Sequence, residues 1–172
     1  MRPANLPTAA ADILAGAAIV SALPMENDYI GDAFLLVIAS VCLYAGGVVL
    51  NDVFDLAVDQ TERPERPIPS GLIPQPTAAI YGFVLLATGC LVAFLTNPVA
   101  GVVSLLLALF ILLYDAVAKK HGFFGPLTMG LCRALNLIMG MAVVGMSFMD
   151  TWYFAIIPLV YIFAITLISR GE

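Results

Sequence analysis

The sequence predicts an all-α integral membrane protein with about six transmembrane helices. Hydrophobic residues make up 62% of the chain and charged residues 11%, and the mean hydropathy is +1.02. These values lie outside the range of soluble domains. Apolar segments close to the ~20 residues that span a bilayer recur along the chain. No stretch alternates apolar and polar residues over the ~10-residue strands of a membrane barrel, so helices are expected throughout.

Six apolar segments can be delimited by the polar, Pro-rich or Gly-rich stretches between them. They cover approximately residues 8–24, 30–50, 77–96, 99–118, 123–147 and 151–169. Arg2 before the first segment is also typical of a signal peptide. Asp12 within that segment and the five segments behind it favour a retained first helix.

The basic residues predict the orientation of the chain in the membrane. The connections after the first, third and fifth segments hold no Lys or Arg, and Glu26, Asp28 and Asp150 are the acids among them. The basic residues outside the apolar segments are separated from one another by even numbers of membrane crossings, so they lie on the same side of the membrane. The positive-inside rule makes that side cytoplasmic. These positions are Arg2, Arg63, Arg66, Lys119, Lys120 and Arg170. We therefore expect a multi-pass protein of the cell membrane whose N-terminus is cytoplasmic.

Several kinds of site are not indicated by the sequence. No basic run suggests a nucleic-acid partner. Cys42, Cys90 and Cys132 lie in apolar segments without close pairing, so neither disulfides nor a Cys-based metal site is expected. His121 stands alone at a segment boundary and is interpreted as a loop residue.

An acidic run, residues 51–59, follows the second apolar segment directly. Its polar members are Asn51, Asp52, Asp55 and Asp59. On a continuous helix at about 100° per residue they fall within an arc of roughly 100°, so they would share one face. A divalent cation such as Mg²⁺ would relieve their repulsion and leave coordination sites for a phosphate. The alternative is a solvated helix end just outside the membrane, where acids cost little.

The next residues, 62–71, carry two arginines among three prolines. Pro64, Pro67 and Pro69 end any helix and stiffen the loop. Arg63 and Arg66 are suited to bidentate binding of phosphate oxygens. Acids followed by a stiff basic loop favour a site for a metal and an anion. An anchor loop on the cytoplasmic side is the alternative.

Arg133 lies about ten residues into the fifth segment, and Asn136 shares its helix face. A buried arginine in a membrane should face the bundle interior and pair with a carboxylate such as Asp12 or Asp115, or with a ligand phosphate. Lys119 and Lys120 are either topology determinants or substrate contacts. Glycines in the helices, such as Gly46, allow close packing or leave room for a long apolar ligand.

The run NDVFDLAVD followed by RPERPIPSG resembles the first signature of the UbiA superfamily of intramembrane prenyltransferases. Asn51, Asp55 and Asp59 match the three ligand positions of that signature, and Asp52 is a commonly seen extra acid. Tyr114 with Lys119, and Arg133 with Asn136, resemble features of the family's fourth and fifth helices. The opening RPANLPTAAADILAG resembles the EboC-like branch. The resemblance covers essentially the whole chain, residues 1–172, as one transmembrane domain.

The resemblance implies a nine-helix bundle in which two Asp-rich motifs hold Mg²⁺ and the diphosphate of an isoprenoid donor. It implies transfer of the isoprenyl group to an aromatic or other lipophilic acceptor, with metal and basic residues stabilising the leaving group. The expected metal ligands are Asn51, Asp52, Asp55 and Asp59, and the expected catalytic residues are Asp55, Asp59 and Arg133. The expected substrate-binding residues are Arg63, Arg66, Lys119, Asn136 and Tyr114.

The family pattern also includes a second acidic motif and three more helices, which would follow Glu172. We therefore expect this sequence to be the first part of a longer chain. Residues 1–172 alone are expected to be inactive and poorly stable, to form homo-oligomers, or to need a C-terminal remainder. Two alternatives stay open: a non-catalytic protein that binds, exports or helps assemble a lipophilic metabolite, and an ion-coupled transporter using Asp12 and Arg133. The intact diphosphate signature argues against the transporter.

Overall fold

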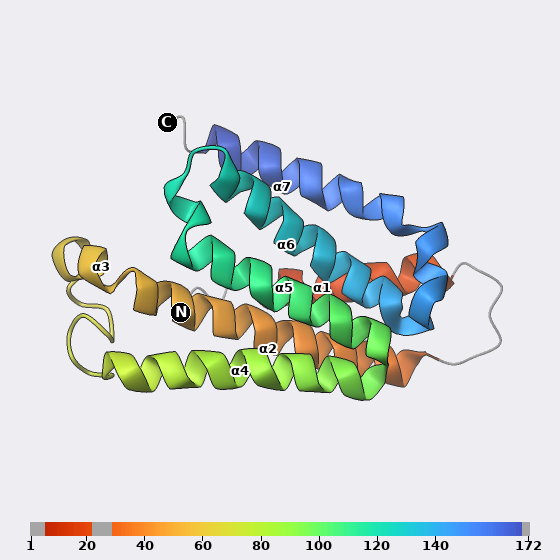
Figure 1. Cartoon of the computed structure of the whole chain (residues 1–172), viewed down its shortest axis with the longest axis horizontal. Helices are drawn as coiled ribbons and strands as arrows, with labels where there is room; N and C mark the ends of the chain where they lie inside the picture. Colours follow the sequence, from red (N-terminus) through yellow and green to blue (C-terminus); the bar gives the residue numbers. More distant parts are fainter. Residues whose placement is uncertain (1–5, 22–28, 170–172) are drawn as a thin grey trace.

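The apolar segments form helices that lie side by side in a bundle (Figure 1). The structure, a computed structural model, describes residues 6–21 and 29–169. The α-helices are α1 (Leu6–Ser21), α2 (Ile30–Phe54), α3 (Leu56–Glu62), α4 (Gln75–Thr96), α5 (Pro98–Ala116), α6 (Phe124–Met141) and α7 (Ile156–Ile168). Short 3-10 helices η2 (Ala118–Lys120), η3 (Ala142–Asp150) and η4 (Trp152–Ala155) join them. The prediction of an all-α fold is confirmed, since the described residues contain no strand.

Four of the helical stretches described are long and apolar enough to cross a membrane. They are Ile30–Phe54, Gln75–Thr96, Pro98–Ala116 and Phe124–Asp150. The shorter apolar helices Leu6–Ser21 and Trp152–Ile168 correspond to the first and sixth predicted segments. Many large apolar side chains are exposed on the outer surface, such as Phe34, Leu95 and Ile157. A bilayer would cover such a surface at no hydrophobic cost, which agrees with the predicted membrane location.

The helices are arranged so that α2 contacts α1, α4 and α5, and α6 contacts α1, α5 and α7. In Figure 1, α4 forms one edge of the bundle and α7 the other, with the remaining helices between them. The fully buried large side chains include Leu36 and Leu43 on α2, Met139 and Met141 on α6, and Ile13 on α1. The core runs through the bundle along α2 and α6 and includes buried side chains of α1, α4 and α5.

Glycines set the distances between the helices. A Cβ atom added at Gly46 would lie 2.9 Å from the carbonyl oxygen of Gly82 on α4, and one at Gly89 would lie 2.8 Å from that of Ala39 on α2. Gly16 on α1 and Gly140 on α6 meet each other's helix backbones even more closely. Of the two readings of these residues, close helix packing is the one the structure supports at these positions.

Two helix boundaries differ from the sequence prediction. The sequence places the acidic run, residues 51–59, on a continuous helix, but α2 ends at Phe54 and α3 starts at Leu56, with Asp55 at φ −89° and ψ 4° between them. Backbone hydrogen bonds from Asp55 to Asn51 and from Asp59 to Asp55 continue through this point, so the chain bends and stays helical. The fifth segment leaves the α-helix at Met141, because the chain turns at Gly145, whose φ is +63°.

Candidate metal and anion site

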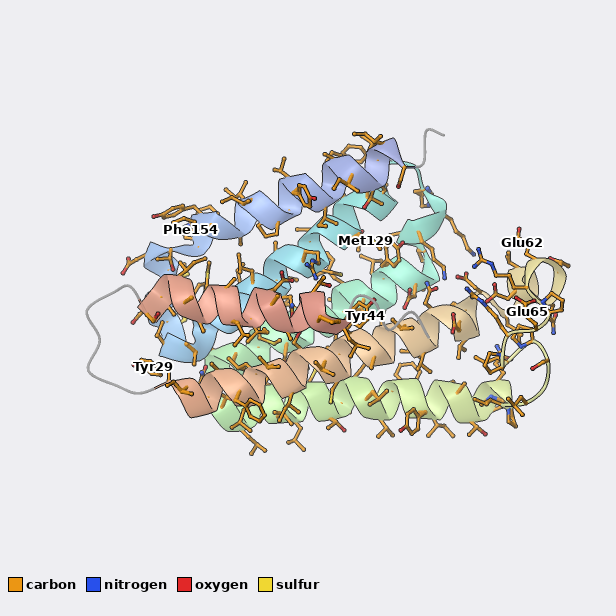
Figure 2. All side chains as sticks on the ribbon, turned by 180° about the vertical axis from the view of Figure 1, so that it is seen from behind. Tyr29, Tyr44, Glu62, Glu65, Met129 and Phe154 are labelled. Atoms are coloured by element: carbon orange, nitrogen blue, oxygen red, sulfur yellow. The ribbon has the colours of Figure 1, made fainter. Side chains whose placement is uncertain are left out.

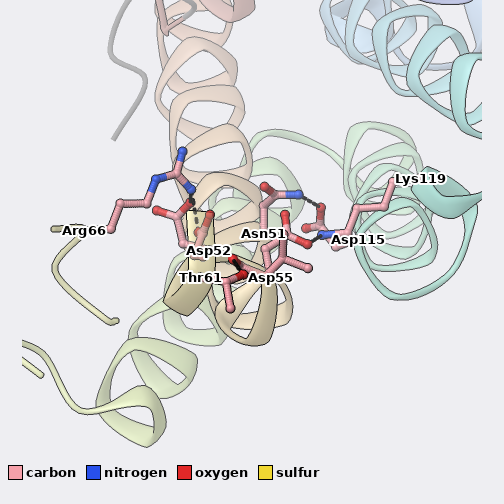
Figure 3. Close-up of polar contacts among 9 residues, drawn as sticks. Asn51, Asp52, Asp55, Thr61, Arg66, Asp115 and Lys119 are labelled. Atoms are coloured by element: carbon pink, nitrogen blue, oxygen red, sulfur yellow. Dashed lines mark hydrogen bonds and ion pairs between the residues drawn. The ribbon is translucent and has the colours of Figure 1, made fainter. Parts of the chain in front are cut away.

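The acidic run lies at the end of the bundle where α2 bends into α3 and where α5 passes into η2. Figure 2 shows charged side chains gathered at this end, and Figure 3 shows the contacts among them. Because the chain bends at Asp55, the polar residues of the run do not lie on one continuous helix, as the sequence prediction assumed. As a consequence, the polar side chains of the run have partners from two directions: the loop after α3 and the end of α5 with η2.

The proline-rich loop after α3 folds back onto the acids. Its backbone closes through hydrogen bonds from Ser70 N to Arg66 O at 2.9 Å and from Ile73 N to Pro67 O at 3.0 Å. Gly71 occupies the left-handed region at φ +78°, which a side chain disfavours. The folded loop places the guanidinium of Arg66 over the acidic run. The expectation of a stiff loop that brings an arginine to the carboxylates is met at Arg66.

Arg66 contacts two of the acids with one nitrogen. Its Nη1 donates to Asp59 Oδ2 at 2.6 Å and to Asp52 Oδ1 at 3.2 Å. Asp59 is buried, with 4% of its surface exposed. The hydrogen bond to Asp59, followed by the charges of the nearby acids, raises the pKa of Arg66 above its usual value, so this guanidinium stays charged at any physiological pH.

The other side of the acidic run faces the end of α5. Lys119 of η2 forms an ion pair with Asp55, with 2.6 Å between Nζ and Oδ1. Asn51 donates from Nδ2 to Asp115 Oδ1 at 2.8 Å. Asp115 is 3% exposed, and its second oxygen, Oδ2, has no hydrogen-bond partner among the described residues. The sequence prediction named Asp115 only as a candidate partner for Arg133. The sequence did carry a feature that could have indicated a role for Asp115 in the site: it is an acid directly after Tyr114, near the end of the apolar fourth segment.

The charges of this cluster do not balance. Four carboxylates, Asp52, Asp55, Asp59 and Asp115, meet two cations, Arg66 and Lys119. Four minus two leaves an excess of two negative charges, which matches one divalent cation. The described residues include no group of three or more His, Cys, Asp or Glu side chains already gathered around a metal position. Asp52, Asp55 and Asp59 instead pair with Arg66 and Lys119. The oxygen donors of Asn51, Asp52, Asp55 and Asp59 nevertheless fit a hard cation such as Mg²⁺.

Arg133 and Asn136 belong to a different polar cluster, between α1, α2 and α6. Arg133 Nη1 pairs with Asp12 Oδ2 at 3.0 Å, and Asn136 Nδ2 donates to the carbonyl of Ala9 at 2.9 Å. Ser40 on α2 donates to Asn136 Oδ1 at 2.7 Å. Asp12 is thus the carboxylate partner of Arg133. The structure does not bring Arg133 and Asn136 into contact with the acidic run, although the sequence grouped them in one site.

The ion pair of Arg133 and Asp12 borders an apolar cavity of about 360 Å³ between α1, α6 and the η4–α7 segment. Leu137, Phe154 and Tyr161 are among its lining residues.

Arg63, Lys120 and Tyr114 come from the same parts of the chain as the acidic cluster. Arg63 is exposed in the loop, Lys120 is exposed at the end of η2, and Tyr114 is half-buried beside Asp115. Their predicted roles stay predictions.

The helical bundle thus carries at one end both the acidic run and the arginine loop on which the resemblance to the UbiA superfamily rests. The sequence model of the UbiA prenyltransferase family matches residues 5–170, which is nearly the whole chain. The chain therefore belongs to the UbiA prenyltransferase family and is a multi-pass membrane protein.

Two similar proteins carry the name of one enzyme. The chain is 34% identical over 169 residues to a digeranylgeranylglyceryl phosphate synthase of Methanoregula boonei, covering 98% of this chain and 56% of the relative. It is 38% identical over 113 residues to the enzyme of the same name from Methanococcoides burtonii, covering 65% of this chain and 40% of the relative. The chain thus spans about half the length of the curated relatives it matches.

Solved structures show the same fold. A structure of digeranylgeranylglyceryl phosphate synthase in membranes superimposes with a TM-score of 0.73 at 28% identity, covering 96% of this chain and 55% of that one. A UbiA homologue from Aeropyrum pernix superimposes with a TM-score of 0.77 at 20% identity, covering 97% of this chain and 62% of that one. The prediction of a UbiA-type helical bundle is confirmed.

Proposed function

We propose that the protein transfers an isoprenyl group from an isoprenyl diphosphate to a lipophilic acceptor within the membrane, with Mg²⁺ as cofactor. The observation that carries the proposal is the acidic cluster: its excess of two negative charges lies beside Arg66 and Lys119 at the end of an apolar bundle. A donor with a diphosphate head and a long apolar tail has the matching chemistry, because the head needs cations and the tail needs a lipid-like surrounding.

Each charged group has a role in this proposal. Asp55 and Asp59, with Asn51 and Asp52, would hold the cation. Arg66 and Lys119 pair with these acids in the structure. In the proposal, both would contact a phosphate once a cation takes over the carboxylates. A bound divalent cation supplies charge stabilisation for the departing diphosphate. Arg133 and Asn136 are proposed to act on the donor or acceptor from the cluster near α1.

The acceptor is proposed from the relatives. Proteins at 34% and 38% identity are named digeranylgeranylglyceryl phosphate synthases. We therefore infer that the acceptor is a glyceryl phosphate that already carries one isoprenyl chain, in place of the aromatic compound considered from the sequence. The opening residues, which resemble a branch without an assigned acceptor, do not decide between the two.

The site is proposed to face the cytoplasm. Arg63, Arg66, Lys119 and Lys120 lie in the same two connections as the acidic cluster, and the positive-inside rule places such connections on the cytoplasmic side of the cell membrane. Protease or cysteine-labelling accessibility in sealed vesicles measures this orientation directly. Labelling of the loop at residues 63–71 from the extracellular side would contradict it.

The test is binding and transfer by the full-length protein in membranes. Asp55→Ala and Asp59→Ala should each reduce Mg²⁺-dependent binding of labelled geranylgeranyl diphosphate at least tenfold, with insertion unchanged because removing a carboxylate makes the helix more apolar. Asp150→Ala is the matched control, since Asp150 is an exposed acid at the end of η3. Unchanged donor binding in both site variants would refute the metal and anion site. Binding without transfer to any glyceryl phosphate or aromatic acceptor would refute the enzyme and support a lipid-binding role.

A further inference from the structure

Asp115 stands out among the buried polar groups because the sequence signature does not include it and its surroundings do not satisfy it. It lies on α5, one residue before the helix ends, and is 3% exposed. Its Oδ1 accepts a hydrogen bond from Asn51 Nδ2 at 2.8 Å, across 64 residues of sequence. Its Oδ2 is buried without a hydrogen-bond partner in the described part of the chain. A buried carboxylate oxygen left unpaired is costly, so a specific role is the physical expectation.

The contact with Asn51 fixes the orientation of that side chain. A carboxylate can only accept hydrogen bonds, so the end of the Asn51 amide that faces Asp115 must be the NH₂ group. The carbonyl oxygen of Asn51 is then held on the side of the amide that faces away from Asp115. An amide without such a partner could rotate by half a turn and present its nitrogen, which cannot bind a cation.

We propose that Asp115 is a positioning residue for the cation site: it locks the amide of Asn51 so that its oxygen is presented to a divalent cation held by the acidic run. The inference rests on the proposed function, since it assumes that the run binds a cation. Figure 3 shows the arrangement, with Asn51 directed toward Asp115 from α2 and Lys119 lying beside both Asp115 and Asp55.

The burial of Asp115 strengthens its hydrogen bond with Asn51. Water competes little for Asp115 Oδ1 at 3% exposure, so the charge-assisted hydrogen bond to Asn51 keeps its strength and geometry. The unpaired Oδ2 makes no hydrogen bond to a described residue that would pull Asp115 away from Asn51. By contrast, Asp52 and Asp55 are about a quarter to a third exposed at their side chains, and each pairs with a cation, Arg66 or Lys119.

The experiment uses the purified full-length protein with Mn²⁺ as the probe, and electron paramagnetic resonance counts the free metal during a titration with inorganic pyrophosphate present. Asp115→Asn keeps the shape but allows the Asn51 amide to rotate, and should weaken Mn²⁺ binding about tenfold. Asn51→Ala should weaken it by a similar factor. In the double variant the two losses should not add, because Asp115 acts only through Asn51. Thermal stability without metal is recorded for every variant.

The control is Ser104→Ala, which removes another buried polar group of α5, one that donates to Gly101 in its own helix. It should leave Mn²⁺ binding unchanged. Losses that add in the double variant would refute positioning and indicate that Asp115 binds the cation itself. Unchanged Mn²⁺ binding by Asp115→Asn would also refute the inference. If Asp115→Asn does not fold, the same comparison is made with Asp115→Glu, which keeps the charge but lengthens the side chain. Absence of pyrophosphate-dependent Mn²⁺ binding in the unmodified protein would instead overturn the proposed function.

Discussion

Gly140 on α6 lies against the backbone of α1, and Gly140→Ala tests whether this contact holds the bundle together. The new Cβ would lie 2.7 Å from Ile13 Cα and 2.9 Å from Ile13 C. Carbon atoms pack at about 3.5–4.0 Å, so the two helices would have to separate by about 1 Å. Backbone atoms cannot rotate out of the way as a side chain does, and α1 has to move as a whole.

The separation would also affect the polar cluster between the same helices. The distance from Arg133 Nη1 to Asp12 Oδ2 is 3.0 Å, and that from Asn136 Nδ2 to Asp12 Oδ2 is 3.2 Å. Adding about 1 Å would take both beyond hydrogen-bond distance. Overpacking costs about 1–3 kcal/mol and each lost hydrogen bond about 1 kcal/mol. We expect the free energy of unfolding to fall by about 3–5 kcal/mol.

Reversible unfolding of the full-length protein in mixed detergent micelles measures this change. Gly31→Ala is the matched control, because a Cβ at Gly31 in the first turn of α2 would meet nothing within 4 Å. That variant should be neutral or slightly more stable, since alanine favours a helix over glycine by up to about 1 kcal/mol. If Gly140→Ala were as stable as Gly31→Ala, the close contact between α1 and α6 would be wrong.

Three further changes follow from single contacts. Asn136→Ala removes a buried amide that joins α6 to α1 through the carbonyl of Ala9. The free energy of unfolding, measured in the same micelles, should fall by about 1–3 kcal/mol. An unchanged value would contradict the contact with Ala9. Gly71→Val forces a side chain into φ +78°, which costs roughly 1–2 kcal/mol. The displaced loop should weaken pyrophosphate binding, and an unchanged affinity would mean that the loop does not position Arg66. Asn97→Ala removes the cap that accepts from Ala100 N at the start of α5 and should cost about 1–2 kcal/mol in thermal unfolding, with no effect on pyrophosphate affinity.

The sequence by itself determined that the protein is a helical membrane protein and which charged residues lie together at one end of it. Apolar segments of membrane length fixed where most helices run, because few other structures satisfy a backbone in lipid. Polar side chains are too costly to place deep in the bilayer without partners, so the run at 51–59 and the arginine loop had to lie at a segment boundary. The prediction that Arg66 meets the acids also came from the sequence alone. It rested on the prolines, which end the helix and stiffen the loop that carries Arg66.

The tertiary structure alone decided which groups pair. Asn51 and Asp115 are 64 residues apart, and Asn136 and Asp12 are 124 apart, yet both pairs are in hydrogen-bond contact. Helix periodicity gives the face on which a side chain lies, but not the helix that faces it or the distance between the two. Those are set by close contacts between helices, such as Gly140 against Ile13, and by the bend at Asp55. For this reason the sequence grouped Arg133 with the acids, whereas packing placed it with Asp12 and left Asp115 beside Asn51.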